Sequence, residues 1–317
     1  MVSTPNTAFE TKTFPYGDAA IAEGARLITA GQPVAVPTET VYGLAADAVN
    51  AAAVAAIYAA KGRPSFNPLI VHVIDLAAAE AIAVIDDAAR ALAAAFWPGP
   101  LTLVVPMRPD SGIASLVTAG LDTIAIRVPA HRAMRALLAA TRKPLAAPSA
   151  NASGAISPTR AAHVLASLNG RIAMIIDDGP TSAGLESTII MPGDPPRLLR
   201  PGPIPAEVIE AVIGAALAAA PGGIIAPGQL ASHYAPAKPL RINANIARAG
   251  EWMIGFGDLP GDDTLSETGD LIEAAARLFD CLHRADASDC VGIAVARIPI
   301  DGIGVAINDR LIRAAHR

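Results

Sequence analysis

The stretch "NAAAVAAIYAAKGRPSFNPLIVHVI", residues 50–74, passes from a helical pattern directly into an apolar strand pattern. Asn50 is a favoured residue for the N-cap of the helix, and Gly62 is a favoured residue near its end. Pro64 prevents the helix from continuing and pushes Arg63 toward an extended conformation. The apolar run after Pro64 then predicts a strand. A helix followed so closely by a strand indicates an α/β fold.

Short apolar runs and helical patterns alternate over most of the first 220 residues. The predicted strands are 32–39, 68–74, 100–107, 122–129, 171–177, 187–192 and 196–202, and residues 143–151 run from a strand into a loop. The predicted helices are 50–62, a long one ending near Ala95, 131–141, one starting at Ser157-Pro158 and one over about 205–218. Because several strands follow one another directly, we expect a mixed sheet with helices.

The chain changes character at "PGGIIAPGQLASHYAPAKP", residues 221–239, where proline and glycine are dense. Such a segment predicts an ordered linker or a tied-down loop. Beyond it, alternating strand and helix patterns predict a small α/β unit with parallel strands. The strands are 251–257 and 291–299, and the apolar face of the first helix consists of Leu271, Ala275, Leu278, Phe279 and Leu282. We therefore expect one domain over 1–220, a linker over 221–239 and a second domain over 240–317.

The composition favours a globular protein with a large core, because 52% of the 317 residues are hydrophobic and only 17% are charged. The weakly polar stretch 211–227 is interrupted by Pro221 and two glycines, so it is too broken to cross about 30 Å of hydrocarbon. The first residues lack the basic and apolar regions of a signal peptide. Two cysteines are too few for a disulfide scaffold or a Cys-rich zinc site. We expect a soluble cytoplasmic protein.

The charge argues against nucleic acid as the main ligand. The net charge is −5 at pH 7, whereas domains that bind nucleic acid by neutralising phosphates are usually basic. Residues 251–270 contain several acidic side chains and neither lysine nor arginine, so this surface should repel a phosphate backbone. We therefore expect a small anionic ligand rather than tightly bound RNA.

Lys61 and Arg63 flank Gly62 at the edge between the helix and the loop. The planar guanidinium of arginine suits phosphate or carboxylate, and lysine supplies a compact charge. Glycine lets the backbone approach a ligand closely. The alternative is that both cations only stabilise the negative end of the helix dipole.

Polar residues also follow several predicted strands, where ligands often bind in α/β folds. The segment "APSANASG", residues 147–154, suits either an anion-binding nest or a simple turn. His72 is either a hydrogen-bonded core residue or a ligand contact. Arg127 lies in an apolar strand, and its unpaired burial would be costly. It therefore needs a carboxylate partner from the protein or from a substrate.

Two further segments place hydroxyl groups near strand ends. Thr38, Glu39 and Thr40 follow the first predicted strand and either cap the next element or contact a polar ligand. The segment "GLESTII", residues 184–190, is followed by Arg200. The sequence contains no G-x-S-x-G, H-E-x-x-H or G-x-x-x-x-G-K-[ST] motif. Several cations with neutral hydrogen-bonding groups predict a site that binds multiply anionic substrates and works by positioning and charge neutralisation.

The ordered segments "PTETVYGL", "KGRPSFNPLIVHV", "WPGPLTLVV", "TIAIRVP", "PLAAPSANASG" and "ESTII" resemble the YrdC-type L-threonylcarbamoyladenylate synthases over about residues 15–215. The segments "GQLASHYAPAKPL" and "GIGVAINDRLIRAA" resemble the longer, two-domain members of that family. The resemblance implies an α/β fold in which a twisted, mostly mixed sheet surrounds a concave, positively charged cavity. A small Rossmann-like C-terminal domain would follow.

The resemblance also implies a reaction, in which ATP, bicarbonate or CO2, and L-threonine give threonylcarbamoyl-AMP and pyrophosphate. The product would pass to the proteins that transfer the threonylcarbamoyl group to tRNA. Mg²⁺ would be carried by the ATP phosphates, since no metal site of the protein itself is evident. The linker would close over the cavity and protect the labile product from water.

The site residues implied by the resemblance fall into two groups. The K-x-R and S-x-N signature falls on Lys61, Arg63, Ser149 and Asn151, with Lys61 and Arg63 as the catalytic cations. Together with these four, the implied ATP contacts are Asn67, Thr123, Ala147, Arg200 and Tyr234. The implied threonine contacts are Thr40, His72, Arg127 and Ser187.

Two alternative functions remain open from the sequence. One is a carbamoyl-adenylate-forming enzyme of the hydrogenase-maturation type, but such proteins carry Cys-rich zinc fingers, and this chain has only Cys281 and Cys290. The other is a non-catalytic RNA-binding module, which the acidic balance disfavours.

Overall fold

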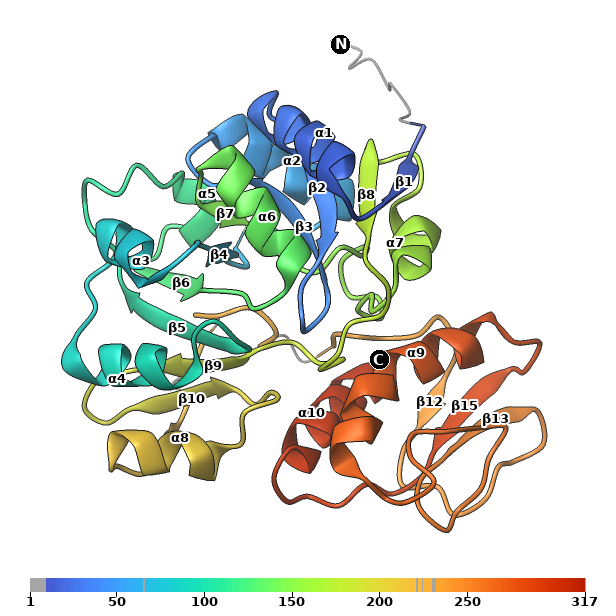
Figure 1. Cartoon of the computed structure of the whole chain (residues 1–317). Helices are drawn as coiled ribbons and strands as arrows, with labels where there is room; N and C mark the ends of the chain where they lie inside the picture. Colours follow the sequence, from blue (N-terminus) through green and yellow to red (C-terminus); the bar gives the residue numbers. More distant parts are fainter. Residues whose placement is uncertain (1–9, 65, 221, 224, 230–231, 317) are drawn as a thin grey trace.

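The computed structural model describes residues 10–64, 66–220, 222–223, 225–229 and 232–316. Its helices are α1 (Asp18–Thr29), α2 (Ala51–Lys61), α3 (Leu76–Ile82), α4 (Asp87–Phe96), α5 (Ser115–Thr118), α6 (Arg132–Thr141), α7 (Ala161–Leu168), α8 (Ala206–Ile213), α9 (Leu271–Ala287) and α10 (Gly304–Ala315). Figure 1 shows a larger N-terminal unit in blue to yellow and a smaller C-terminal unit in orange and red.

Within the described residues, eleven strands form one sheet in the order β1-β8-β2-β3-β7-β4-β6-β5-β9-β10-β11. Their bounds are β1 (Lys12–Pro15), β2 (Val34–Pro37), β3 (Tyr42–Asp47), β4 (Ile70–His72), β5 (Leu101–Pro106), β6 (Thr123–Arg127), β7 (Leu145–Ala146), β8 (Met174–Asp177), β9 (Thr188–Met191), β10 (Arg197–Arg200) and β11 (Ala218–Ala219). Strand β2 pairs parallel to β8 and antiparallel to β3, and β6 pairs parallel to β4 and antiparallel to β5. The predicted mixed sheet is confirmed.

Helices cover both faces of one half of this sheet. In β2, Val34 and Val36 pack in a cluster with α1 and α6, whereas Ala35 packs in the cluster that includes α2. Strands buried on both faces need no polar alternation, which explains the continuous apolar runs of the sequence. Over the other half, a small cluster on β4, β5, β6, β9 and β10 includes Ala226 from the linker. There the linker covers the sheet.

The C-terminal unit contains a parallel sheet in the order β12-β15-β13-β14, with bounds β12 (Leu240–Arg241), β13 (Glu251–Gly255), β14 (Asp263–Thr264) and β15 (Gly292–Val295). Helix α9 buries Ala275, Leu278, Phe279 and Leu282 as predicted, and Leu271 is partly buried. The parallel strands and the amphipathic helix are therefore confirmed. The exact predicted domain limits stay a prediction.

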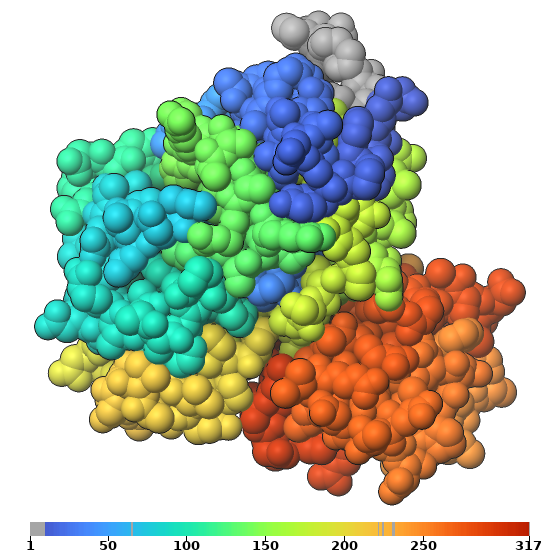
Figure 2. Space-filling view, viewed as in Figure 1, coloured from blue at the N-terminus to red at the C-terminus, as the bar shows by residue number. Residues whose placement is uncertain are grey.

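The two units meet along α9, α10 and the linker. Val41, Ile156 and Leu185 of the N-terminal unit share one apolar cluster with α9 and α10. At the edge of this interface Arg160 forms an ion pair with Asp280 at 2.8 Å. Figure 2 shows the C-terminal unit, in orange and red, packed against the lower side of the N-terminal unit.

Helix α2 forms as its sequence predicts. The Asn50 side chain accepts hydrogen bonds from the backbone N–H groups of Ala52 and Ala53, at 3.0 and 3.2 Å. Gly62 takes the left-handed conformation, with φ 62°, and ends the helix. Lys61 and Arg63 are therefore fixed at the boundary between α2 and the following loop.

Three predicted elements need correction. The long helix before Ala95 is two helices, α3 and α4, because Ala83 pairs with Met107 and Asp86 caps a new helix start. The helix expected at Ser157-Pro158 begins at Ala161, since the Ser157 hydroxyl is turned to Glu186 instead of capping a helix. The helix over 205–218 ends at Ile213, where Gly214 adopts the left-handed conformation.

Strands β1 and β3 and helix α1 were not predicted. All residues of β3 are buried, so the strand lacks the alternation that marks a strand with one wet face. Part of the predicted linker, residues 221, 224, 230 and 231, lies outside the described residues. Among the helices that the structure describes, none is long and apolar enough to cross a membrane.

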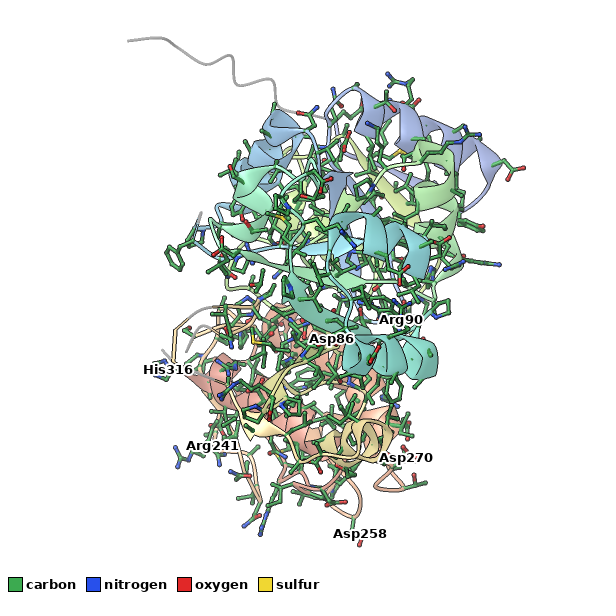
Figure 3. All side chains as sticks on the ribbon, turned by 90° about the vertical axis from the view of Figure 1, so that its left-hand side faces the viewer. Asp86, Arg90, Arg241, Asp258, Asp270 and His316 are labelled. Atoms are coloured by element: carbon green, nitrogen blue, oxygen red, sulfur yellow. The ribbon has the colours of Figure 1, made fainter. Side chains whose placement is uncertain are left out.

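Two acidic residues of the segment 251–270 are located on the C-terminal unit. Figure 3 places Asp258 and Asp270 at the periphery of this unit. Asp270 caps α9 by accepting hydrogen bonds from the N–H groups of Ile272 and Glu273. Other acids of the segment are paired, Glu251 with Arg241 and Asp263 with Arg277 and Arg284, so the predicted repulsion of phosphate by 251–270 stays a prediction.

We predict that Asn50→Ala lowers the free energy of unfolding by about 1 kcal/mol, because it removes the cap of α2. Urea denaturation measures this change. Asn50→Asp keeps an acceptor at the cap and should retain most of the stability, so equal losses in both variants would contradict the capping role.

Candidate functional site

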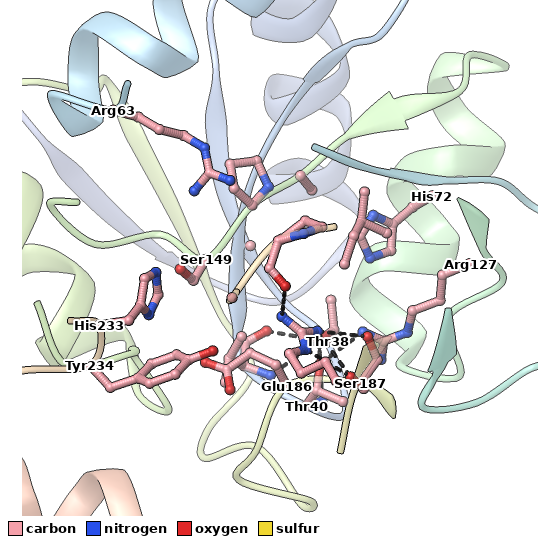
Figure 4. A pocket seen from close by; sticks show the side chains of 18 residues that line it. Thr38, Thr40, Arg63, His72, Arg127, Ser149, Glu186, Ser187, His233 and Tyr234 are labelled. Carbon is pink, nitrogen blue, oxygen red and sulfur yellow. Dashed lines mark hydrogen bonds between the residues drawn. The ribbon is translucent and has the colours of Figure 1, made fainter. Parts of the chain in front are cut away.

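A cavity lies where several loops of the large sheet meet the linker (Figure 4). Its lining comes from the turn between β2 and β3, the loop after α2, strand β4, the end of β6, the loop after β7, the segments around β9 and β10, and the linker. The lining residues are Thr38, Thr40, Val41, Gly43, Arg63, Ile70, His72, Arg127, Ala147, Pro148, Ser149, Glu186, Ser187, Arg200, Pro227, Gly228, His233 and Tyr234.

Most residues implied by the family resemblance converge on this cavity. Those that line it are Thr40, Arg63, His72, Arg127, Ala147, Ser149, Ser187, Arg200 and Tyr234. Figure 4 shows Arg63 at the top of the view and Arg127, Ser187 and Thr40 toward the lower right, while the Tyr234 ring extends inward from the linker. Residues that are far apart in the sequence thus surround one space.

Lys61 and Asn151 do not line the cavity but lie directly behind its wall. The Lys61 ammonium donates to the backbone oxygens of Ser149 and Asn151, both at 2.5 Å. The Asn151 side chain donates to the oxygen of Ala155 at 2.7 Å. The K-x-R and S-x-N segments are therefore in direct contact, and Lys61 sets the path of the loop that carries Ser149.

Asn67 and Thr123 are also absent from the lining. Asn67 is buried, its backbone oxygen accepts from Arg63, and its side-chain oxygen has no hydrogen-bond partner among the described residues. Thr123 begins β6, at the opposite end of the strand from Arg127. Their implied ATP contacts stay predictions.

Burial shapes the charges of Lys61 and Arg63. Burial, and secondarily the charge of Arg63, lowers the pKa of Lys61 well below its usual value. Burial also lowers the pKa of Arg63 to about 10. The Arg63 guanidinium donates to two backbone oxygens, those of Asn67 at 3.2 Å and Pro68 at 2.9 Å. Since carbonyls do not cancel a charge, Arg63 keeps a net positive charge at the cavity wall.

The carboxylate partner of Arg127 is a side chain of the protein itself. It forms an ion pair with Glu39 at 2.6 Å, donates to the Thr40 hydroxyl at 2.9 Å and to the Gly99 oxygen at 3.1 Å. Burial acts to raise the pKa of Glu39, but the contacts with Arg127 outweigh burial and leave that pKa below its usual value. A substrate carboxylate is therefore not needed to make the burial of Arg127 tolerable.

Ser187 and Arg200 form a second fixed group. The Ser187 hydroxyl is 2.7 Å from the hydroxyl of Thr102, and Arg200 donates to the Ser187 hydroxyl at 3.1 Å and to its backbone oxygen at 2.9 Å. Arg200 also donates to the Pro227 oxygen at 3.4 Å. The latter contact joins the cavity wall to the linker.

The linker enters the cavity through His233 and Tyr234. Tyr234 is buried and has a φ of 62°, an uncommon value for a residue with a side chain. Its hydroxyl, the Nδ1 atom of His233 and the Nδ1 atom of His72 have no hydrogen-bond partner among the described residues. Buried polar atoms without partners are costly, so three such atoms at one cavity point to a polar ligand.

The site residues implied by the resemblance leave out several contributors, although Glu39 was named above as a possible cap or ligand contact. Glu186, Gly228 and His233 line the cavity, and Glu39 pairs with Arg127. Glu39 and Glu186 each stand next to a predicted contact in the sequence, Thr40 and Ser187. That adjacency was an available signal, but only the fold could show that both carboxylates point at arginines.

The described residues contain no group of three or more histidine, cysteine, aspartate or glutamate side chains placed to hold a metal ion.

Two family models together match most of the chain. The Sua5/YciO/YrdC model, described as "Telomere recombination", matches residues 26–202, and the model "Threonylcarbamoyl-AMP synthase, C-terminal domain" matches residues 204–316. The Bacillus subtilis protein "Threonylcarbamoyl-AMP synthase" is 43% identical over 94% of this chain and 93% of its own length. The Pyrococcus abyssi protein of the same name is 40% identical over 92% of both chains.

This chain belongs to the threonylcarbamoyl-AMP synthase family. The resemblance inferred from the ordered motifs, including the long two-domain form, is confirmed. As a member of that family, the chain is an enzyme of the adenylyl-transferring type.

Solved structures of threonylcarbamoyl-AMP synthase relatives agree in fold. The structure of P. abyssi Sua5 complexed with L-threonine matches with a TM-score of 0.88 and 37% identity, over 96% of this chain and 97% of that chain. The predicted fold class is therefore confirmed. HypF from T. kodakarensis matches with a TM-score of 0.52 and 20% identity, over 60% of this chain and 25% of that chain. The latter likeness shows a shared fold alone.

We predict that acid destabilises this threonylcarbamoyl-AMP synthase family member through its buried histidines. Burial lowers the pKa of His72 and of His233 from 6.5 to about 3. Between pH 6.5 and pH 3 these histidines bind protons in the unfolded chain but not in the folded chain. The stability that the neutral histidines contribute is therefore complete above pH 6.5 and is lost as the pH falls toward 3. Each histidine should contribute a slope of about 1.4 kcal/mol per pH unit within this window.

Urea denaturation of the wild type and of His72→Gln at a series of pH values between 7 and 4 tests this prediction. The free energy of unfolding of the variant should fall less steeply with decreasing pH, because the variant has one fewer proton-binding histidine in the unfolded chain. Identical pH slopes in the two proteins would contradict it.

Proposed function

We propose that this chain makes threonylcarbamoyl-AMP and pyrophosphate from L-threonine, bicarbonate or CO2, and ATP, for the threonylcarbamoyladenosine modification of tRNA. The observation that carries the proposal is the convergence of Arg63, Arg127 and Arg200 on one cavity with hydroxyl groups and unpartnered polar atoms. Family membership supports the same reaction. The relative whose structure was solved with L-threonine supports threonine as the amino-acid substrate.

The ATP tail is assigned to the side of the cavity where cations have only neutral partners. Arg63 is held by backbone oxygens, and Arg200 by the oxygen and hydroxyl of Ser187. Uncancelled positive charge in a water-poor site stabilises a polyphosphate strongly. Ser149 and Ala147 add small groups that let the nucleotide approach the backbone, and Tyr234 adds a free hydroxyl.

L-Threonine is assigned to the group around Arg127, at Thr40, His72, Arg127 and Ser187, and it adjoins the ATP group where Arg200 donates to the Ser187 hydroxyl. Thr40 and His72 lie beside Arg127, since the first accepts its hydrogen bond and the second is its partner in the β4–β6 register. Burial keeps His72 neutral through the lowered pKa of its imidazole, so the free Nδ1 can hydrogen bond without adding charge. Because Arg127 is already paired with Glu39, it would orient the carboxylate of the bound threonine but would not bind it with an uncancelled positive charge.

The proposed chemistry needs no protein nucleophile. The neutral threonine amine adds to CO2 and loses a proton to give a carbamate; from bicarbonate, the same carbamate forms with loss of water. A carbamate oxygen then attacks the α-phosphorus of ATP, and pyrophosphate leaves. Arg63 and Arg200 stabilise the charge that develops on the phosphorus oxygens and the leaving group, and Lys61 fixes the Ser149 loop against them. Mg²⁺ carried by the ATP phosphates would neutralise part of the same charge.

The linker fits the role of a cover that opens for substrate. The cavity volume is about 50 Å³, well below the roughly 300 Å³ or more of small-molecule pockets. Pro227, Gly228, His233 and Tyr234 line it from the linker. Admission of ATP therefore requires this segment to move, and its return would shield the mixed anhydride from water.

The proposal includes a cytoplasmic location and product transfer to downstream tRNA-modifying proteins, without tight binding of tRNA by this chain. An RNA-binding module is the main alternative of a different class. A filter-binding assay decides between them: tight, salt-sensitive tRNA binding without ATP turnover would favour the alternative.

We predict that Lys61→Ala and Arg63→Ala each reduce product formation at least tenfold, because Arg63 stabilises the developing charge and Lys61 fixes the loop that carries Ser149. The assay is pyrophosphate release that depends on labelled L-threonine, with ATP and bicarbonate present. Arg90→Ala is the matched control, because Arg90 is a half-exposed cation of α4 paired with Glu80 (Figure 3). Full activity in the Lys61 and Arg63 variants would exclude the assigned roles.

We also predict that Gly228→Ala reduces product formation at least tenfold. Gly228 has a φ of 86°, and an added Cβ would lie 2.8 Å from the Tyr234 hydroxyl and 2.9 Å from Arg200 Cδ. Both side chains would have to shift. Gly222→Ala in the same linker meets nothing within 4 Å and should keep wild-type activity. Equal activity of the two variants would show that the linker does not need its closed packing.

A further inference from the structure

Arg310 is a cation in the interior of the molecule, on the last helix of the chain. It lies on α10 and is 0% exposed, and it is the largest of the fully buried side chains that the structure describes. A buried guanidinium requires partners for its charge and its N–H groups. The groups that contact Arg310 therefore indicate its role in the structure.

Three contacts of Arg310 lie outside the C-terminal unit. Its Nε donates to Glu186 Oε2 at 2.8 Å, and one terminal nitrogen donates to the Pro201 oxygen at 3.0 Å. Its guanidinium carbon lies 5.2 Å from the centre of the Tyr234 ring. Only the contact with Asp309, at 2.7 Å, stays within α10. Arg310 is thus directed at the cavity wall and the linker.

Glu186 is the carboxylate that Arg310 neutralises, and it lines the cavity. Its second oxygen accepts a hydrogen bond from the Ser157 hydroxyl. Burial acts to raise the pKa of Glu186, but the charge of Arg310, with that of Arg200, outweighs burial and keeps the pKa below its usual value. Glu186 is therefore an anion at the wall of a cavity that must bind an anion. Without a cation beside it, it would repel a polyphosphate.

Tyr234 is held from the same direction. Its ring lies against Arg310 and against Phe279 of α9, at a centroid distance of 5.6 Å from Phe279. The backbone of Tyr234 is in the left-handed region, which persists only where the surroundings hold it. The C-terminal unit supplies that support.

We propose that Arg310 is a positioning residue for the ATP site: it cancels the charge of Glu186 and seats Tyr234, so that the C-terminal unit sets the affinity of the cavity for the triphosphate. This inference rests on the proposed function. It assigns the C-terminal unit a part in substrate binding through a side chain that does not itself line the cavity.

The test compares Arg310→Met with the double variant Arg310→Met, Glu186→Gln in the full chain. Arg310→Met should raise the KM for ATP at least tenfold and should raise the Kd for a non-hydrolysable ATP analogue by a similar factor. The double variant removes the uncompensated anion, so both constants should return to within threefold of wild type. Arg310→Lys, which keeps the charge, should lie between wild type and Arg310→Met.

Arg241→Met is the matched control for loss of an arginine from the C-terminal unit. Arg241, labelled in Figure 3, pairs with Glu251 in that unit and is not among the residues that line the cavity. The KM and Kd of Arg241→Met should therefore equal those of wild type. Thermal unfolding of each protein reports whether it is folded. If Arg310→Met does not fold, the comparison rests on Arg310→Lys and the double variant.

Wild-type KM and Kd values in Arg310→Met would overturn the inference. A double variant no better than Arg310→Met would also overturn it, because the arginine would then not act through Glu186. Analogue binding separates this inference from the proposed function. A wild type that binds the analogue but releases no threonine-dependent pyrophosphate would refute the function alone, and the Kd comparison would still decide the role of Arg310.

Discussion

The structure depends on the requirement that every buried cation around the cavity has a partner. Lys61, Arg127, Arg200 and Arg310 are buried, and Arg63 is partly exposed at the cavity. Each one draws a different segment toward the same place, because a buried guanidinium or ammonium without hydrogen bonds would be prohibitively costly. The conformations of the loop after β7, the turn after β2, the segment before β9 and the linker are consistent with this single demand.

The nature of each partner divides the cavity into two electrostatic halves. Arg63 donates to backbone oxygens, which leave its charge uncancelled. Arg200 donates to the oxygen and hydroxyl of Ser187, and Glu186, the carboxylate that acts on it, is paired with Arg310. Arg127 is satisfied by the carboxylate of Glu39, which leaves that half nearly neutral. A polyanionic nucleotide tail needs uncancelled positive charge, whereas an amino acid carries both signs and no net charge. The proposed placement of ATP and threonine follows this division.

The sequence predicted what local rules determine and missed what only tertiary pairing determines. Asn50 and Gly62 carry the start and end of α2 in their own conformational preferences, so that helix was predicted correctly. Ser157 looked like a helix cap, but its hydroxyl bonds to Glu186 across 29 positions. The pairing of Glu186 with Arg310 spans 124 positions, although Arg310 falls on the buried stripe of α10 with Ile307 and Leu311. A cation on the apolar face of a helix indicates a buried partner, and this was the local signal of the contact with Glu186.

The cores of the two units are not independent. Val41, Ile156 and Leu185 pack in the same apolar cluster as α9 and α10, and each immediately adjoins a polar residue that lines or supports the cavity: Thr40, Ser157 and Glu186. Because packed interiors do not deform smoothly, a shift of α9 or α10 would carry these apolar residues and their polar neighbours with it. The C-terminal unit therefore constrains the cavity through both charge and packing, and the segment 221–239 joins two sheets that share part of one core.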